Sequence, residues 1–239
     1  MSGHSKWSTI KREKGAKDAK RGAVFTQIGN LIAIAARSGA DPSMNSSLAM
    51  AIEKAKQANM PAANIQRAID RVADKNAAVL EETTYEGMGP GGVGIIIETA
   101  TDNKNRTFPE VRSALTKNGG RVADAGSVMF QFSRKGVIRV AARGEDALLT
   151  VLDAGAEDAV EEDGEIVVYT DQKNLAKVRQ ALIDSGMTLQ EAELQYIPNN
   201  VVSIDDTEVA GRVLKLLDML DDLDDVVGVY TNANITVEI

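Results

Sequence analysis

The residues of this chain whose types could do chemistry are cations, and they gather at its start. Residues 1–21 contain seven Lys or Arg and two Asp or Glu, a net charge of +5. Cations at this density are typical of segments that neutralise phosphates, which supply much of the affinity of proteins for nucleic acids. We therefore expect this segment to bind nucleic acid. The residues predicted to make the contacts are His4, Ser5, Lys6, Trp7, Lys11, Arg12, Lys14, Lys17, Lys20 and Arg21.

The spacing of the cations predicts a basic helix over residues 8–21. At 100° per residue, Lys11, Lys14, Lys17 and Arg21 fall within about 120° of one another, and alanines occupy the other side. Two cations stand in the first turn, where they oppose the helix dipole at a cost of roughly 0.3–1 kcal/mol. A role in meeting phosphates explains that cost. The alanines do not supply the broad apolar face of a membrane-surface helix, so nucleic acid is expected rather than a membrane.

Two single residues in this segment have alternative interpretations. Trp7, the only tryptophan, either anchors the segment in a protein core or stacks on a base. His4, the only histidine, either contacts a phosphate or a base or is simply exposed. A histidine so close to a chain end is a poor general base, because catalysis requires tight positioning.

A second, weaker phosphate-binding candidate consists of Asn103, Lys104, Asn105 and Arg106. These residues precede a predicted helix near Pro109. Free N–H groups at a helix start, together with an arginine, can hold one phosphate. The alternative is a plain polar loop.

The remaining composition points away from an enzyme. The chain has no cysteine and one histidine, which removes thiolate chemistry and two-histidine metal sites. The acidic clusters at 157–165 and 218–225 do not match a calcium loop and are expected to be solvated faces. We expect no metal, no cofactor and no small-molecule substrate, because no acid–base or nucleophile constellation is visible.

Residues 87–92 fit the G-x-G-x-x-G pattern of dinucleotide-binding loops. Such a loop must follow a strand and open a helix, whereas these glycines precede a predicted strand and include Pro90. The sequence therefore predicts a tight turn leading into a strand, and the role of residues 87–94 beyond that turn stays open.

Hydrophobic periodicity predicts an α+β chain with a helical start. Before residue 76, apolar residues recur at helical spacing, and Gly22 is expected to end the first helix. This stretch carries a net charge of +7, whereas residues 76–239 carry −15. Strands at 94–100, 128–132, 201–204 and 227–235 alternate with helices, and residues 137–196 follow a second βαββαβ order. We predict an N-terminal helical domain followed by two ferredoxin-like domains, one inserted in the other. The predicted domains are 1–76, 77–133 plus 201–239, and 134–200.

Several motifs resemble those of the YebC/PmpR family, which includes a mitochondrial translational activator of cytochrome c oxidase subunit I. The motifs run nearly the whole chain: Met1–Trp7, Asp18–Gly22, Asn59–Pro61, Tyr85–Gly92, Thr101–Thr107 and Gly126–Val128.

The resemblance implies three domains and a non-enzymatic regulator of gene expression in the cytoplasm. Its main implication is a ribosome-associated translation factor that contacts ribosomal RNA and eases synthesis through proline-rich stretches. The alternative is a DNA-binding transcriptional regulator. Glu13, Ala23 and Gln27 stand where many relatives are basic, which predicts weaker binding to nucleic acid.

Overall fold

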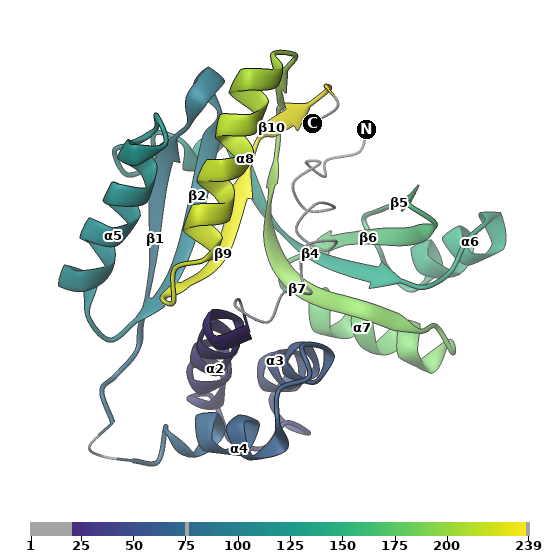
Figure 1. Cartoon of the computed structure of the whole chain (residues 1–239). Coiled ribbons are helices and arrows are strands. Elements are labelled where there is room, and N and C mark those ends of the chain that lie inside the picture. The colour runs from purple at the N-terminus through teal and green to yellow at the C-terminus, as the bar shows by residue number, and fades with distance from the viewer. Residues whose placement is uncertain (1–20, 75–76, 238–239) are drawn as a thin grey trace. The chain divides into compact units, whose positions relative to one another are not determined.

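The computed structural model describes residues 21–74 and 77–237 (Figure 1). The described chain divides into two compact units. One unit is Ser133–Ile197, and the other joins the residues before it to those after it.

Three helices form the first part of the larger unit. They are α2 (Arg21–Ala36), α3 (Ser46–Gln57) and α4 (Ala62–Asp70). Their facing apolar side chains, among them Ile32, Leu48 and Ile65, share one core, as the helical stripes predict. Gly22 lies inside α2 and does not end a helix. Its φ is not in the left-handed region that a helix-ending glycine adopts.

A four-stranded antiparallel sheet forms the second part of this unit. Its strand order is β3-β1-β2-β9, and α5 and α8 supply apolar side chains to its core. A separate parallel pair joins β8 to β10. The bounds are β1 Glu81–Met88, β2 Gly94–Thr101, α5 Lys104–Lys117, β3 Arg121–Val122, β8 Val202–Ile204, α8 Thr207–Asp221, β9 Val226–Thr231 and β10 Ala233–Ile235.

The strands predicted for the discontinuous domain, 77–133 plus 201–239, differ from those in this sheet. Strand β1 was not predicted, and β8 pairs outside the main sheet. The predicted strand at 128–132 is instead a 3-10 turn, η3 (Met129–Gln131), followed by the start of β4. The predicted βαββαβ order of elements in this discontinuous domain is therefore wrong.

The carboxylate of Glu86 explains why residues 126–131 leave the extended conformation. Its two oxygens accept the backbone N–H groups of Gly126 at 2.5 Å, Val128 at 2.6 Å and Met129 at 2.8 Å. In an extended strand, successive N–H groups point to opposite sides, so Val128 and Met129 could not donate to the same oxygen. Glu86 thus binds the turn to the middle of the sheet, where it satisfies backbone donors that would otherwise be buried without partners.

The glycine-rich stretch is the connection between β1 and β2. A short 3-10 turn, η2 (Pro90–Gly92), lies between the strands, and Gly91 has φ +74°. A Cβ at Gly91 would also lie 2.7 Å from Cδ1 of Ile204. The prediction of a turn leading into a strand is confirmed, and these glycines serve backbone geometry and close packing.

The smaller unit contains a second four-stranded sheet, with strand order β5-β6-β4-β7. Its elements follow the predicted order: β4 Phe132–Val140, α6 Glu145–Asp153, β5 Asp158–Glu162, β6 Glu165–Asp171, α7 Leu175–Asp184 and β7 Leu189–Pro198. The helix α7 packs on the face of Gly136, where a Cβ would lie 2.9 Å from Cβ of Leu175. The face that carries Val137 and Tyr169 is the opposite one, because strand residues alternate.

Within the described residues, no helix combines the length and the apolar character that crossing a membrane requires.

Replacing Glu86 with glutamine tests the bond between the turn and the sheet. We expect Glu86→Gln to lower the free energy of unfolding by about 2 kcal/mol, because an amide is a weaker acceptor for three N–H groups than a buried carboxylate. Urea denaturation measures this change. Glu82→Gln, at an exposed position on the same strand, is the control and should leave stability unchanged. Equal effects of the two substitutions would contradict this role.

The same carboxylate predicts a pH dependence. Burial raises the pKa of Glu86, but the three backbone N–H groups outweigh burial, and its pKa lies below the ordinary value of 4.5. A lowered pKa stabilises the folded state above pH 4.5, and this contribution is lost as the pH falls through the folded value. The stability difference between the wild type and Glu86→Gln should therefore shrink on acidification. A difference that stays constant into strong acid would contradict the assignment.

Candidate nucleic-acid interface

The principal predicted contacts lie mostly outside the described residues. His4, Ser5, Lys6, Trp7, Lys11, Arg12, Lys14, Lys17 and Lys20 all fall there, and Arg21 is the first residue of α2. Their role in binding therefore stays a prediction.

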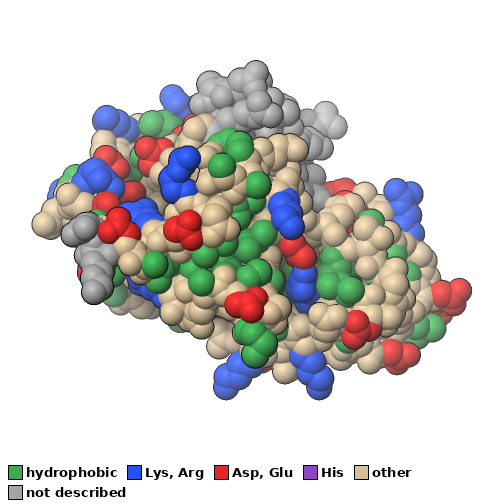
Figure 2. Space-filling view, turned by 90° about the horizontal axis from the view of Figure 1, so that it is seen from below, with side chains coloured by type: hydrophobic (Ala, Val, Ile, Leu, Met, Phe, Trp, Pro, Cys, Tyr) green, Lys and Arg blue, Asp and Glu red, His purple; other side chains and the backbone are tan. Residues whose placement is uncertain are grey.

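The rest of the helical part adds little positive charge. Residues 22–74 contain five Lys or Arg and four Asp or Glu. Figure 2 shows one face of the molecule, on which blue and red side chains are interspersed without a continuous basic area. A basic surface at this end of the chain therefore depends on residues 1–21.

The second predicted locus forms the start of α5. The side chain of Asn103 caps this helix and accepts the N–H of Arg106 at 3.2 Å. Lys104 forms an ion pair with Glu81 at 2.5 Å, and Asn105 is exposed in the first turn. The structure thus gathers the four residues at one helix end.

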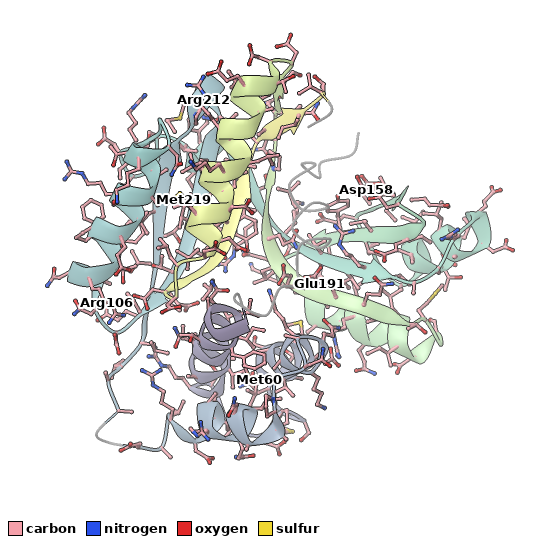
Figure 3. All side chains as sticks on the ribbon, in the orientation of Figure 1. Met60, Arg106, Asp158, Glu191, Arg212 and Met219 are labelled. Carbon is pink, nitrogen blue, oxygen red and sulfur yellow. The ribbon has the colours of Figure 1, made fainter. Side chains whose placement is uncertain are left out.

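Arg106 is engaged by carboxylates. Its Nη2 lies 2.7 Å and 3.0 Å from the two oxygens of Asp225 and 3.3 Å from Oδ1 of Asp102. Figure 3 shows Arg106 at the start of α5. A phosphate at this position would compete with Asp225 for the same guanidinium, so the phosphate role of this locus stays a prediction that requires Arg106 to exchange partners.

Asp225 is the buried centre of this arrangement, with only 6% of its surface exposed. Besides Arg106, it accepts the hydroxyl groups of Thr107 at 2.7 Å and Thr101 at 3.0 Å. Burial raises the pKa of Asp225, but the hydrogen bonds from the two threonines and from Arg106 prevail and hold it below the ordinary value. The aspartate therefore stays ionised inside the protein.

The expected solvated face at 218–225 needs a correction for this residue. Asp222 and Asp224 are exposed, as expected, but Asp225 follows the end of α8 and directly precedes the buried start of β9. The chain turns inward at that point. Glu86 lies in the motif Tyr85–Gly92, but the sequence shows no partner for it, and the only signal for the burial of Asp225 was the apolar strand that follows it.

Further hydrogen bonds tie α2 to the sheet near this site. Asn30 donates to the carbonyl of Ala100 at 3.1 Å, and Arg71 donates to the amide oxygen of Asn30 at 3.4 Å. Arg71 also lies 3.7 Å from Asp102. Gln27 donates to the carbonyl groups of residues 221 and 223 at the end of α8. The Gln27 side chain therefore has a structural use, because it joins α2 to the end of α8.

A cavity of about 510 Å³ lies between these groups. Five carboxylates and two arginines line it, together with four uncharged residues. The excess of negative charge makes the cavity unfavourable for a phosphate. Among the described residues, no cluster of three or more His, Asp or Glu is placed to hold a metal ion.

One face of the smaller unit is also acidic. The strand register puts Asp158, Glu162, Glu165 and Asp171 on the face of Tyr169, and Glu191 joins them through an ion pair with the buried Arg139. Figure 3 labels Asp158 and Glu191 on this unit. Lys135 and Arg139 are the cations placed there by the register of β4. The carboxylates outnumber the cations on this face, while its centre around Val137, Arg139 and Tyr169 is buried.

Replacing Asp225 with asparagine tests its role as the centre of this site. We expect Asp225→Asn to lower the free energy of unfolding by about 1–3 kcal/mol, because Arg106 and two buried hydroxyl groups lose a charged acceptor. Thermal and urea denaturation check this. The exposed neighbour provides the control, since Asp224→Asn should change stability by less than about 0.5 kcal/mol. Wild-type stability of Asp225→Asn would contradict the assignment.

Two family descriptions match the chain and together cover most of it. Residues 5–75 match "TACO1/YebC protein N-terminal domain", and residues 80–233 match "TACO1/YebC second and third domain".

Similar proteins agree with these matches. A protein of Moorella thermoacetica is 48% identical over 98% of this chain and 96% of its own length, and one of Rubrobacter xylanophilus is 48% identical over 100% and 98%. Both are named "Probable transcriptional regulatory protein". The crystal structure of the conserved hypothetical protein Aq1575 from Aquifex aeolicus is similar over 93% of each chain, with 40% identity and a TM-score of 0.85. The chain described here belongs to the TACO1/YebC family.

Proposed function

We propose that this protein is a nucleic-acid-binding regulator of gene expression, without enzymatic activity, that acts on transcription in the cytoplasm. The observation that carries the proposal is the separation of charge along the chain. Residues 1–21 have a net charge of +5, and residues 22–239 have a net charge of −13. A polyanion is then drawn to one end of the protein and repelled by the rest. The names of the similar proteins favour transcription as the process.

The helices α3 and α4 support a duplex DNA partner. They are joined by a four-residue turn, 58–61, in which Asn59 has φ +57°. Two helices joined by so short a turn are the basic plan of helix-turn-helix readers, whose second helix enters the major groove. The exposed side chains of α4 include Gln66 and Arg67, and these residue types read adenine and guanine edges.

A second candidate function is a ribosome-associated translation factor, as the family resemblance implies. The acidic face of the smaller unit favours it, because that face suits protein contacts better than a DNA duplex. In this alternative the basic segment contacts ribosomal RNA, and the partner is the ribosome.

We also propose the three-domain division into 1–76, 77–133 plus 201–239, and 134–200. The compact unit Ser133–Ile197 and the separate family matches at 5–75 and 80–233 support it. The order β4-α6-β5-β6-α7-β7, with strands arranged β5-β6-β4-β7, supports a ferredoxin-like fold for the inserted domain.

Charge reversal tests the basic segment. Lys11→Glu, Lys14→Glu, Lys17→Glu and Arg21→Glu together should abolish binding to duplex DNA and to ribosomal RNA, because phosphate contacts supply most of the affinity. In the wild type, the logarithm of the binding constant should fall with the logarithm of salt concentration by roughly 0.7–0.9 per phosphate contact. Fluorescence anisotropy at several salt concentrations measures both effects.

The matched control reverses four exposed lysines elsewhere: Lys117→Glu, Lys173→Glu, Lys177→Glu and Lys215→Glu. This variant changes the net charge by the same amount and should keep the salt slope. Equal losses in the two variants would show that total charge matters, and not the basic segment. Sedimentation after DNase treatment separates the two functions, since movement with ribosomes at low salt supports translation and its absence supports transcription.

A further inference from the structure

The side chain of Phe130 is 72% exposed, although it lies in a tightly held turn. Single exposed apolar side chains are common and usually need no explanation. Hydrogen bonds hold the turn η3 that carries Phe130, both before and after this residue. The exposure of this ring is therefore a fixed feature of the structure.

Two signature segments hold the residues before Phe130. Glu86, from the motif that contains the glycine-rich turn, accepts the N–H groups of Gly126, Val128 and Met129. Val128 is 1% exposed and packs on Gly94, where a Cβ would lie 2.8 Å from its Cγ1. Segments about 40 residues apart in the chain thus meet in one structure, and Phe130 is the large side chain that this structure leaves in solvent.

Hydrogen bonds also hold the residues after Phe130. The N–H of Gln131 donates to the carbonyl of Val128 at 3.0 Å, and the N–H of Asn199 donates to the carbonyl of Gln131 at 2.8 Å. The side-chain amide of Asn232 donates to Oε1 of Gln131 at 2.8 Å, and that of Asn199 donates to the carbonyl of Phe130 at 3.3 Å. The backbone of Phe130 is fixed on both sides. Little backbone conformational entropy is therefore lost when a partner binds to the ring.

The chain around Phe130 is uncharged, in contrast to the acidic domain to which it belongs. Neither residues 125–133 nor residues 198–204 contain Asp, Glu, Lys or Arg. Amide and hydroxyl side chains are present instead, including the exposed Ser127 and Asn200. The Ser127 hydroxyl donates to the carbonyl of Asp124 at 2.6 Å, so its oxygen is left to accept from the edge of a nucleobase, whereas the amide of Asn200 can both donate and accept. The exposed Asp124 borders this uncharged segment.

The apolar area is too small for a protein partner to be the favoured occupant. Val201, two residues after Asn199, is 48% exposed, and Met129, next to Phe130 in the chain, is half-buried. A stable protein interface typically buries about 800 Å² on each partner around a cluster of anchors. One phenyl ring among amides matches a stacked base better, because base–aromatic stacking needs a single exposed ring.

We propose that Phe130 is a stacking platform for one unpaired nucleobase. The proposal rests on the proposed nucleic-acid-binding function and adds a preference for single-stranded or unstacked positions, which the basic segment alone does not provide.

The test compares Phe130→Ala with the wild type in the full-length protein. The probes are a 12-nucleotide single-stranded RNA, a DNA strand of the same sequence and the matching DNA duplex. We expect Phe130→Ala to weaken binding of a single strand about tenfold, to leave duplex binding unchanged and to leave the salt slope unchanged, because stacking releases no counterions. Phe130→Trp should restore the affinity. Val79→Ala, at a position 70% exposed, is the matched control and should have no effect.

The outcomes separate this proposal from the proposed function. Wild-type affinity of Phe130→Ala for both single strands overturns the stacking role, while loss of binding on charge reversal in residues 1–21 still supports the proposed function. An equal loss for duplex and single strands, or a changed salt slope, also overturns it. If the wild type binds none of the three probes, both proposals fail. Which single strand loses affinity, RNA or DNA, identifies the source of the base.

Discussion

A carboxylate can stay ionised inside a protein only where hydrogen-bond donors surround it, and two carboxylates in the larger unit meet this condition. Glu86 collects three backbone N–H groups, and Asp225 collects two threonine hydroxyl groups and the Arg106 guanidinium. Each carboxylate joins segments that are distant in the chain. Glu86 fixes the turn that carries Phe130, and Asp225 fixes the start of α5 beside the contacts of α2.

The second constraint is electrostatic and concerns the whole chain. A protein with a net charge of −8 is repelled by nucleic acid on average, so binding requires that positive charge be concentrated in one place. The described helices cannot supply that concentration, because residues 22–74 are nearly neutral. The buried ion pair at Arg106 also removes a cation from the surface. These facts leave residues 1–21 as the segment on which the charge argument depends.

Sequence reasoning succeeded where one physical signal determined the structure. In residues 137–196, alternating apolar residues and helical stripes fix each element, and the order of elements follows. It failed at β1 and η3, because Glu82, Thr84 and Glu86 do not look like a strand and Val128, Phe130 and Phe132 alternate like one. Pairing with β2 and β3 makes β1 a strand, and the Glu86 carboxylate holds η3 across about 40 residues of chain. No local pattern shows either contact. For the candidate site, the sequence shows which residues are charged but not which of them pair. The pairing of Arg106 with Asp225 could not be predicted, because 119 residues separate them in the chain.

The two proposed contact types act over different ranges, which explains why one protein would need both. Attraction between residues 1–21 and phosphates extends over about 8 Å at physiological salt and does not depend on base sequence. Stacking on Phe130 acts only at contact and requires a base that has left its helix. A basic segment by itself would hold any polyanion, and a single ring by itself would bind too weakly to be useful. Together they would favour nucleic acids that contain an unpaired position, because only there can both contacts form at once.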